Sequence, residues 1–311
     1  MTFTPANIRT LSIAAAFTAA LLFSAGCRKP DPIDLTSPPA DSPVKVEMPE
    51  TTPPPYFGLS DVDSVGLFTP PDGAHLGQLL IEGAEYDASF GNHQILHHEG
   101  TLARAIFFNP NLSVVAGRDT AYSSVDVGTL VVDSSQLKKI PKLYTPENST
   151  IPTRLGIQYL LLTRDMILDG GLMYLGSHTY EWDCNGGLPT GNSIRIDAPP
   201  KLRVIYPTAL QFLHSSEDLH VRWFGGGDSV SVLIRSLEGN LPGKVLVRLA
   251  ATVNTGGMVL PKSLLSLLPQ NQTQFFFTFT SSKTGTTHIE GYPRDVFVQT
   301  TTSHTVLLTL R

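Results

Sequence analysis

Hydrophobic positions along most of the chain follow a two-residue period, and this period predicts β-strands. Leu219, Val221 and Trp223 give the clearest case, because a polar residue separates each from the next. Such alternation is typical of a strand with one face buried and the other in solvent. Few segments have a helical period, and turn signals rich in Gly, Asn and Pro separate the apolar runs. The pattern therefore predicts an all-β protein.

Further strands are predicted on both sides of the pair Pro199-Pro200. They are Leu76–Ile81, Leu102–Phe108, Val125–Val132, Ile157–Leu162 and Tyr180–Cys184 before it, and Leu202–Tyr206, Ser229–Ile234, Lys244–Val253, Gln274–Thr280, Asp295–Thr300 and His304–Leu310 after it. Short helical turns are expected within Ser134–Tyr144 and Pro261–Leu268, and a hairpin turn at Gly225–Asp228. We interpret residues 56–200 and 201–311 as two tandem β-sandwich-like domains.

The second of these domains resembles the immunoglobulin-like and fibronectin type III-like modules of secreted bacterial proteins. The strand Val221-Arg222-Trp223, the glycine-rich turn after it and the turn Thr255-Gly256-Gly257 carry the resemblance. It implies an antiparallel sandwich with Trp223 at the centre of its core. It implies a fold and not an activity.

At the N-terminus an apolar run without this period predicts a secretory signal. Residues 11–23 are apolar apart from Ser12 and Thr18, and Arg9 precedes them. The run of about 13 residues is shorter than the roughly 20 that a membrane-spanning helix needs. We therefore expect residues 1–26 to be a cleaved signal peptide.

The junction Ser24-Ala25-Gly26-Cys27 resembles the lipobox of bacterial lipoproteins, although Ser24 stands where the family prefers a large aliphatic residue. The resemblance implies diacylglycerol on Cys27 and usually a further acyl chain, such as palmitate, and two or more chains make anchoring to a membrane stable. Arg28 follows in place of aspartate, which by the sorting rule of enteric bacteria implies the outer membrane. The periplasmic and the surface face both stay open.

Behind Cys27 the chain is rich in proline. Nine prolines lie within residues 28–55, among Asp, Glu, Ser and Thr. This composition predicts an extended, semi-rigid spacer, so residues 27–55 are expected to be a lipidated cysteine with its tether. The whole arrangement is similar to that of uncharacterised envelope lipoproteins, which suggests no substrate.

Charge and cysteine content narrow the function classes. Charged residues make up 16% of the chain and the net charge is −5, whereas nucleic-acid binding needs a basic surface. Cys27 and Cys184 are the two cysteines, so acylation of Cys27 leaves no internal disulfide and no multi-cysteine zinc site. Cys184 is expected to be buried as a small hydrophobic residue.

One cluster has the residue types of a metal site. His93, His97 and Glu99 would share one face of a strand, since even numbers of residues separate them. Imidazole and carboxylate groups are ligands for zinc and similar ions. The alternative is an ordinary polar strand edge. We expect no cofactor, and His93, His97 and Glu99 are the candidate ligands if a metal binds.

These features predict a lipid-anchored envelope protein that displays its β-domains to a protein or glycan partner, without catalysis. No Gly-x-Ser-x-Gly elbow and no phosphate-binding glycine loop occurs in the sequence. The alternative is an envelope hydrolase acting on glycan. It depends on Glu181 and Asp183, which flank Trp182 as a pair of carboxylates beside an aromatic ring.

Overall fold

The computed structural model describes residues 44–47, 75–89, 95–116, 119–144, 153–164, 171–186, 193–209, 211–239, 241–251 and 253–311. Residues 41–311 form one compact unit, distinct from residues 1–40. The predicted signal peptide and Cys27 lie outside the described residues. Within the described ranges, no helix is both long enough and apolar enough to cross a bilayer.

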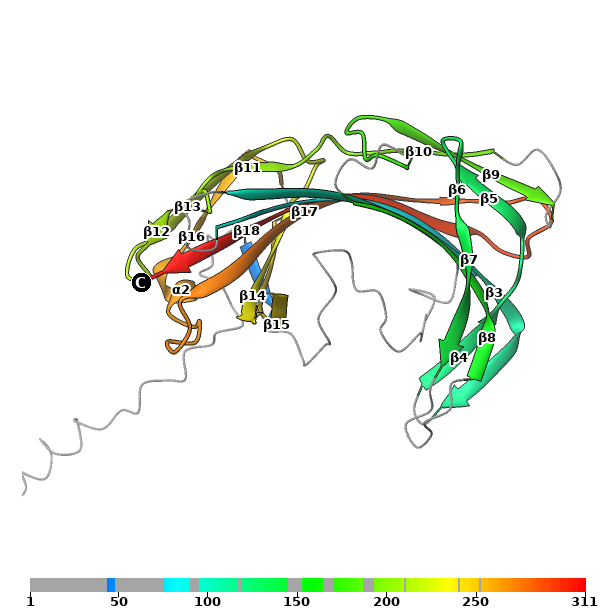
Figure 1. Ribbon diagram of the computed structural model, residues 1–311, viewed down its shortest axis with the longest axis horizontal. Coiled ribbons are helices and arrows are strands. Elements are labelled where there is room, and N and C mark those ends of the chain that lie inside the picture. The colour runs from blue at the N-terminus through cyan, green and yellow to red at the C-terminus, as the bar shows by residue number, and fades with distance from the viewer. Residues whose placement is uncertain are drawn as a thin grey trace, which may run out of the picture. The chain divides into compact units, whose positions relative to one another are not determined.

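The prediction of an all-β, sandwich-like protein is confirmed. The described chain forms three β-sheets, and α2 (Lys262–Leu265) is the one α-helix in these ranges (Figure 1). This helix lies within the predicted helical turn at Pro261–Leu268. The other predicted turn, at Ser134–Tyr144, is wrong, because that segment forms β6 (Ser135–Gln136) and β7 (Lys138–Tyr144).

The largest sheet has eleven strands, in the order β1-β15-β14-β17-β18-β2-β3-β8-β7, with β12 beside β18 and β4 beside β3. Its remaining strands are β1 (Val44–Glu47), β2 (Gly77–Ala88), β3 (Leu96–Ala116), β4 (Asp119–Ser124), β8 (Thr153–Arg164), β12 (Phe212–Leu213), β14 (Ser231–Glu238), β15 (Leu241–Ala251), β17 (Gln274–Thr287) and β18 (Val296–Leu310). The predicted strands Asp295–Thr300 and His304–Leu310 are thus one continuous strand, β18.

Two smaller sheets complete the structure. The four-stranded sheet has the order β10-β9-β5-β6, and the three-stranded sheet has the order β11-β13-β16. Their bounds are β5 (Gly128–Val132), β9 (Thr179–Gly186), β10 (Ser193–Asp197), β11 (Arg203–Tyr206), β13 (Leu219–Phe224) and β16 (Gly257–Leu260).

Each small sheet covers a different part of the large sheet and encloses its own hydrophobic core. In the first core, Trp182 and Tyr180 of β9 pack with Leu79 and Phe107 of the large sheet. In the second core, Trp223 of β13 packs with Phe279 of β17, with 5.8 Å between ring centroids. Trp223 is 3% exposed, which confirms its predicted place in a core.

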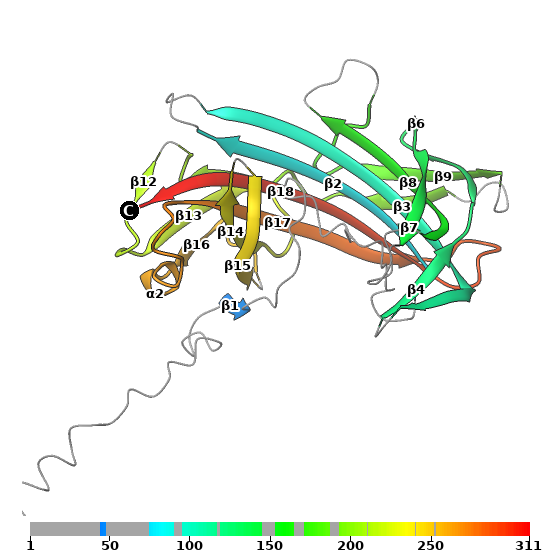
Figure 2. The same ribbon diagram turned by 60° about the horizontal axis from the view of Figure 1, so that its bottom comes forward.

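Both cores lie on the same face of the large sheet. Val298 of β18 belongs to the first core, and Val306 and Leu308 belong to the second. Even numbers of residues separate these positions, so their side chains point to one face of the strand. Figure 2 shows β18 beside β17 and β2.

The predicted boundary near residue 200 separates the cores but not the sheets. Strand β18 pairs in parallel with β2 from Val296↔Gly77 to Val306↔Asp87. Strands from both predicted domains therefore belong to one hydrogen-bonded sheet. Alternation predicts which side of a strand is buried and does not predict which strand is its neighbour.

The glycine-rich segment at residues 225–228 is not the predicted hairpin. Strand β13 pairs with β11 and β16, whereas β14 pairs with β15 and β17, so the segment crosses from one sheet to another. Gly225 has φ +77°, and a Cβ atom there would lie 1.7 Å from the carbonyl oxygen of Lys201. Close passage of two backbones, and not a tight hairpin, explains the glycine.

The predicted tether at residues 27–55 also contains a strand. β1 pairs antiparallel with β15, from Val44↔Ala251 to Glu47↔Arg248. The expectation of a continuous spacer to residue 55 is therefore wrong at its C-terminal end. The composition of the segment indicated extended backbone correctly, but one edge of the large sheet offers that backbone hydrogen-bonding partners.

Candidate functional site

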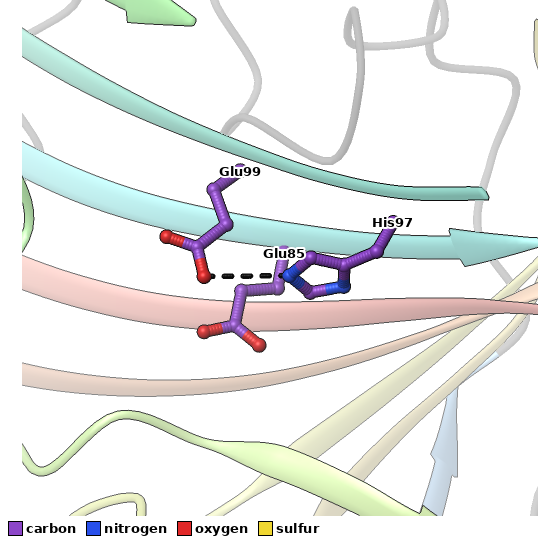
Figure 3. A group of neighbouring side chains, drawn as sticks. All are labelled: Glu85, His97 and Glu99. Carbon is purple, nitrogen blue, oxygen red and sulfur yellow. Dashed lines mark hydrogen bonds and ion pairs between the residues drawn. The ribbon is translucent and has the colours of Figure 1, made fainter. Parts of the chain in front are cut away.

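The structure brings together two of the three candidate metal ligands and adds a third residue from another strand. His97 and Glu99 lie on β3, and His93 lies outside the described residues. Glu85 of β2 is directly opposite Glu99 in the antiparallel register. One ligand atom from each of Glu85, His97 and Glu99 lies within 4.8 Å of the others (Figure 3). The sequence did not indicate Glu85, because its place beside Glu99 depends on the register between β2 and β3.

His97 lies between two carboxylates. Its Nδ1 is 2.7 Å from Oδ1 of Asp87, and its Nε2 is 3.3 Å from Oε1 of Glu99. Partial burial lowers the pKa of His97, but the hydrogen bonds with Asp87 and Glu99 outweigh it, so the pKa is raised. The imidazolium form can donate to both carboxylates at once, which makes it the favoured form here.

A lysine supplies the second positive charge. Nζ of Lys201 is 3.3 Å from Oε1 of Glu85 and 3.2 Å from Oε2 of Glu99. Burial raises the pKa of Glu99, but His97 and Lys201 together lower it below its ordinary value. A divalent metal would have to displace both the ammonium group and the imidazolium proton. Each of the three carboxylates Glu85, Asp87 and Glu99 thus already has His97 or Lys201 as a partner, and the arrangement gives little support to a metal site.

His304 of β18 is fully buried next to this network. Its Nδ1 accepts a hydrogen bond from the backbone N–H of Val204, at 3.1 Å. In the neutral ring this places the proton on Nε2, which lies 3.2 Å from Oδ2 of Asp87. Burial raises the pKa of Asp87, but the contacts with His304 and His97 outweigh it and lower the pKa to about 2.

Three buried polar residues of β18 hold the segment that joins the two regions. We call Thr300, Thr302 and His304 the polar strip, and Asp197–Val204 the linker. Thr300 donates its hydroxyl to the carbonyl of Asp197 at 2.8 Å, and the backbone N–H of Leu202 donates to the Thr302 hydroxyl at 3.0 Å. With the bond from Val204 to His304, alternate positions of β18 bind successive parts of the linker. The strip lies between the two cores and satisfies the linker's backbone where it crosses the sheet.

The hollow beside the network is too small for a substrate. Its volume is about 30 Å³, and Glu85, Glu99, Tyr174, Lys201 and Thr302 are among the residues that line it. Ligand pockets usually have volumes of roughly 300–1,000 Å³. A hollow of this size has room for about one water molecule.

The carboxylate pair of the hydrolase hypothesis lies on the outer face of the four-stranded sheet. Trp182 and Cys184 of β9 are buried, so Glu181 and Asp183 point the other way. Hydrogen bonds from Ser193 and Arg195 lower the pKa of Glu181. A general acid of a glycosidase needs a raised pKa, so Glu181 is poorly suited to that role.

Cys184 is buried, as expected from the sequence. It is 1% exposed, and burial raises the pKa of its thiol to about 11. A reactive cysteine needs an accessible thiolate near neutral pH. The structure therefore gives Cys184 a packing role in the first core.

Comparison with known proteins adds no name. No protein-family model matches the chain, no curated protein is detectably similar to it, and no solved structure matches it.

Proposed function

We propose that this protein is a lipid-anchored component of a bacterial outer membrane that displays a β-structured unit to a protein or glycan partner, without catalysis. The observation that carries the proposal is the apolar N-terminal run followed by Ser24-Ala25-Gly26-Cys27. Acyl chains on Cys27 would hold the chain at a membrane, because each buried methylene contributes about 0.8 kcal/mol.

The folded unit supports a binding role better than a catalytic one. In the titratable cluster each of Glu85, Asp87 and Glu99 is paired with His97 or Lys201, and the cluster lies beside the linker that the polar strip holds. Its charges therefore stabilise the fold and have no room for a substrate beside them. The likeness of residues 201–311 to immunoglobulin-like modules stays a prediction in this proposal.

The path from Cys27 to the folded unit fits a spacer. Residues 28–43 separate the cysteine from β1, and at ~3.1 Å per residue an extended segment of that length spans about 50 Å. Such a spacer would let the unit meet a partner at some distance from the lipid headgroups.

Metabolic labelling tests the anchor. Cells that express the full chain with a tagged fatty acid should incorporate label into the wild type and not into Cys27→Ser. Cys184→Ala is the matched control, because it removes the other cysteine of the chain and should keep the label. Label that persists on Cys27→Ser, or that is lost from Cys184→Ala alone, contradicts the proposal.

A further inference from the structure

The outward face of the three-stranded sheet combines exposed apolar and cationic side chains. We call it the basic apolar face and define it by Arg203, Ile205, His220, Arg222, Phe224 and Val259. Phe224 is 56% exposed, Ile205 47% and Val259 45%. The register places Phe224 opposite Arg203 and Val259 opposite His220, so apolar side chains lie beside arginine and histidine across this face.

This face carries positive charge in a chain whose net charge is negative. Strands β11, β13 and β16 contain no Asp or Glu, whereas the whole chain has a net charge of −5. Arg203 and Arg222 are both exposed. The guanidinium of Arg222 lies 5.8 Å from the ring centroid of Tyr206. Both arginines are therefore available to an anionic partner.

The side-chain chemistry distinguishes between kinds of partner. A neutral glycan is recognised by carboxylate and amide groups that bind its hydroxyls, together with an aromatic ring. The basic apolar face has the ring but none of these groups. Arginine with exposed aromatic and aliphatic side chains on an open surface is typical of contact with the headgroup region of an anionic bilayer.

The anchor enters the same region of the molecule. β1 pairs with β15, and Val247 and Leu249 of β15 lie in the second core, beneath the three-stranded sheet. β1 therefore joins the folded unit at the edge of the large sheet, next to the core that the three-stranded sheet covers. A single attachment of this kind does not fix orientation, whereas a second contact with the membrane does.

We propose that the basic apolar face binds the surface of an anionic phospholipid bilayer. The identity of the membrane rests on the proposed function, but binding to vesicles can be measured without the acyl anchor. Each arginine near an anionic surface contributes about 1 kcal/mol, which is about fivefold in partitioning. Phe224 and Ile205 add apolar contact at the headgroup boundary.

The test uses residues 27–311 with Cys27→Ser and measures cosedimentation with vesicles. Vesicles of phosphatidylcholine alone should bind weakly, and vesicles with about a third phosphatidylglycerol should bind well. Arg203→Gln with Arg222→Gln should weaken that binding about 30-fold. Lys138→Gln with Arg195→Gln is the matched control, because it removes two exposed positive charges on strands of the other sheets, β7 and β10, and should change binding less than about twofold.

A second variant separates the apolar contribution from charge. Phe224→Ser should weaken binding, whereas Leu175→Ser, at a position 50% exposed in the other region, should not. The inference is overturned if Arg203→Gln with Arg222→Gln binds the vesicles as well as Lys138→Gln with Arg195→Gln does. Binding to an acidic polysaccharide but not to anionic vesicles overturns it as well. Fatty-acid labelling of Cys27 and binding to vesicles are measured independently. Either proposal can therefore be contradicted while the other holds.

Discussion

The two hydrophobic cores differ in where their residues lie along the sequence. Among described residues, the second core draws on one stretch, from Leu202 to Leu310. The first core draws on Leu76 to Ala198 and then on four residues from much later, Ile289, Tyr292, Val296 and Val298. The C-terminal region is therefore complete in its own core but also supplies part of its neighbour's. A boundary in the sequence near residue 200 separates most residues of the two cores, but it does not separate the strands of the large sheet.

Tyr292 shows how the late segment enters the first core. It follows β17, and its hydroxyl donates to the carbonyls of Leu76 and Phe108, the latter at 2.8 Å. Its ring lies edge-on to Phe107, with 5.6 Å between centroids. The segment between β17 and β18 is thus built into the other region. A division of the chain at residue 200 would leave the first core without these residues and β18 without its partner β2.

Cutting the chain at that point should have the largest effect. Residues 201–311 alone lose the pairing of β18 with β2 and expose Ile289, Val296 and Val298. We expect this fragment to lack a cooperative urea transition by circular dichroism, whereas residues 75–311 should keep one. A fragment 201–311 that melts as cooperatively as residues 75–311 would show that the second core is sufficient by itself.

Trp223→Ala should have the next largest effect, because it tests the second core alone. Loss of a buried tryptophan side chain costs about 3–5 kcal/mol. His220→Ala, on the exposed face of the same strand, should change the free energy of unfolding by less than about 0.5 kcal/mol. Urea melts of the two variants in residues 75–311 give the comparison, and similar midpoints would contradict the strand register.

Asp87 lies between the cores. Asp87→Asn should lower the free energy of unfolding less than Trp223→Ala does, by an amount that depends on pH. A pKa lowered from 3.8 to about 2 stabilises the folded state by up to about 2 kcal/mol above pH 4. That contribution is lost as the pH falls through the range from about 4 to about 2. The gap in stability between wild type and Asp87→Asn should therefore close over this range. Asp183→Asn, at an exposed position, is the control and should leave no gap to close.

Lys201→Met should have the smallest effect. The ammonium group is partly exposed, so its two ion pairs contribute about 1 kcal/mol or less. Without it the pKa of Glu99 should rise, since Lys201 is one of the groups that lower it. Urea melts at low and high salt should show a difference that shrinks as salt screens the charges. A loss much greater than this would mean that Lys201 holds the linker by more than charge.

The alternation of apolar and polar residues predicted the strands. The neighbours of each side chain depended on the register between strands. Leu219, Val221 and Trp223 could be placed in a core because alternation alone determines their side of the strand. Glu85 could not be placed beside Glu99, since the register of their strands depends on the seven residues between them, 89–95. His304 could not be assigned a role, because its partners Val204 and Asp87 lie 100 and 217 positions away.

The polar strip also depends on contacts between residues that are distant in sequence. Thr300, Thr302 and His304 occupy positions whose burial would predict apolar residues. They are polar because the linker's backbone crosses the sheet there and needs partners. These polar residues could have been predicted only if the point where the linker crosses the sheet had been known.

The late entry of residues 289–298 into the first core has a consequence for how the chain acquires its structure. A polypeptide that emerges N-terminus first, at a ribosome or through an export channel, presents Leu79 and Phe107 long before Tyr292 and Val296. Part of the apolar surface of the first region therefore stays exposed until the 185 residues from Phe107 to Tyr292 have followed. Contacts so distant in sequence form slowly, because a large loop has to close first. During that interval the edge of β2 is open to wrong pairing with other strands.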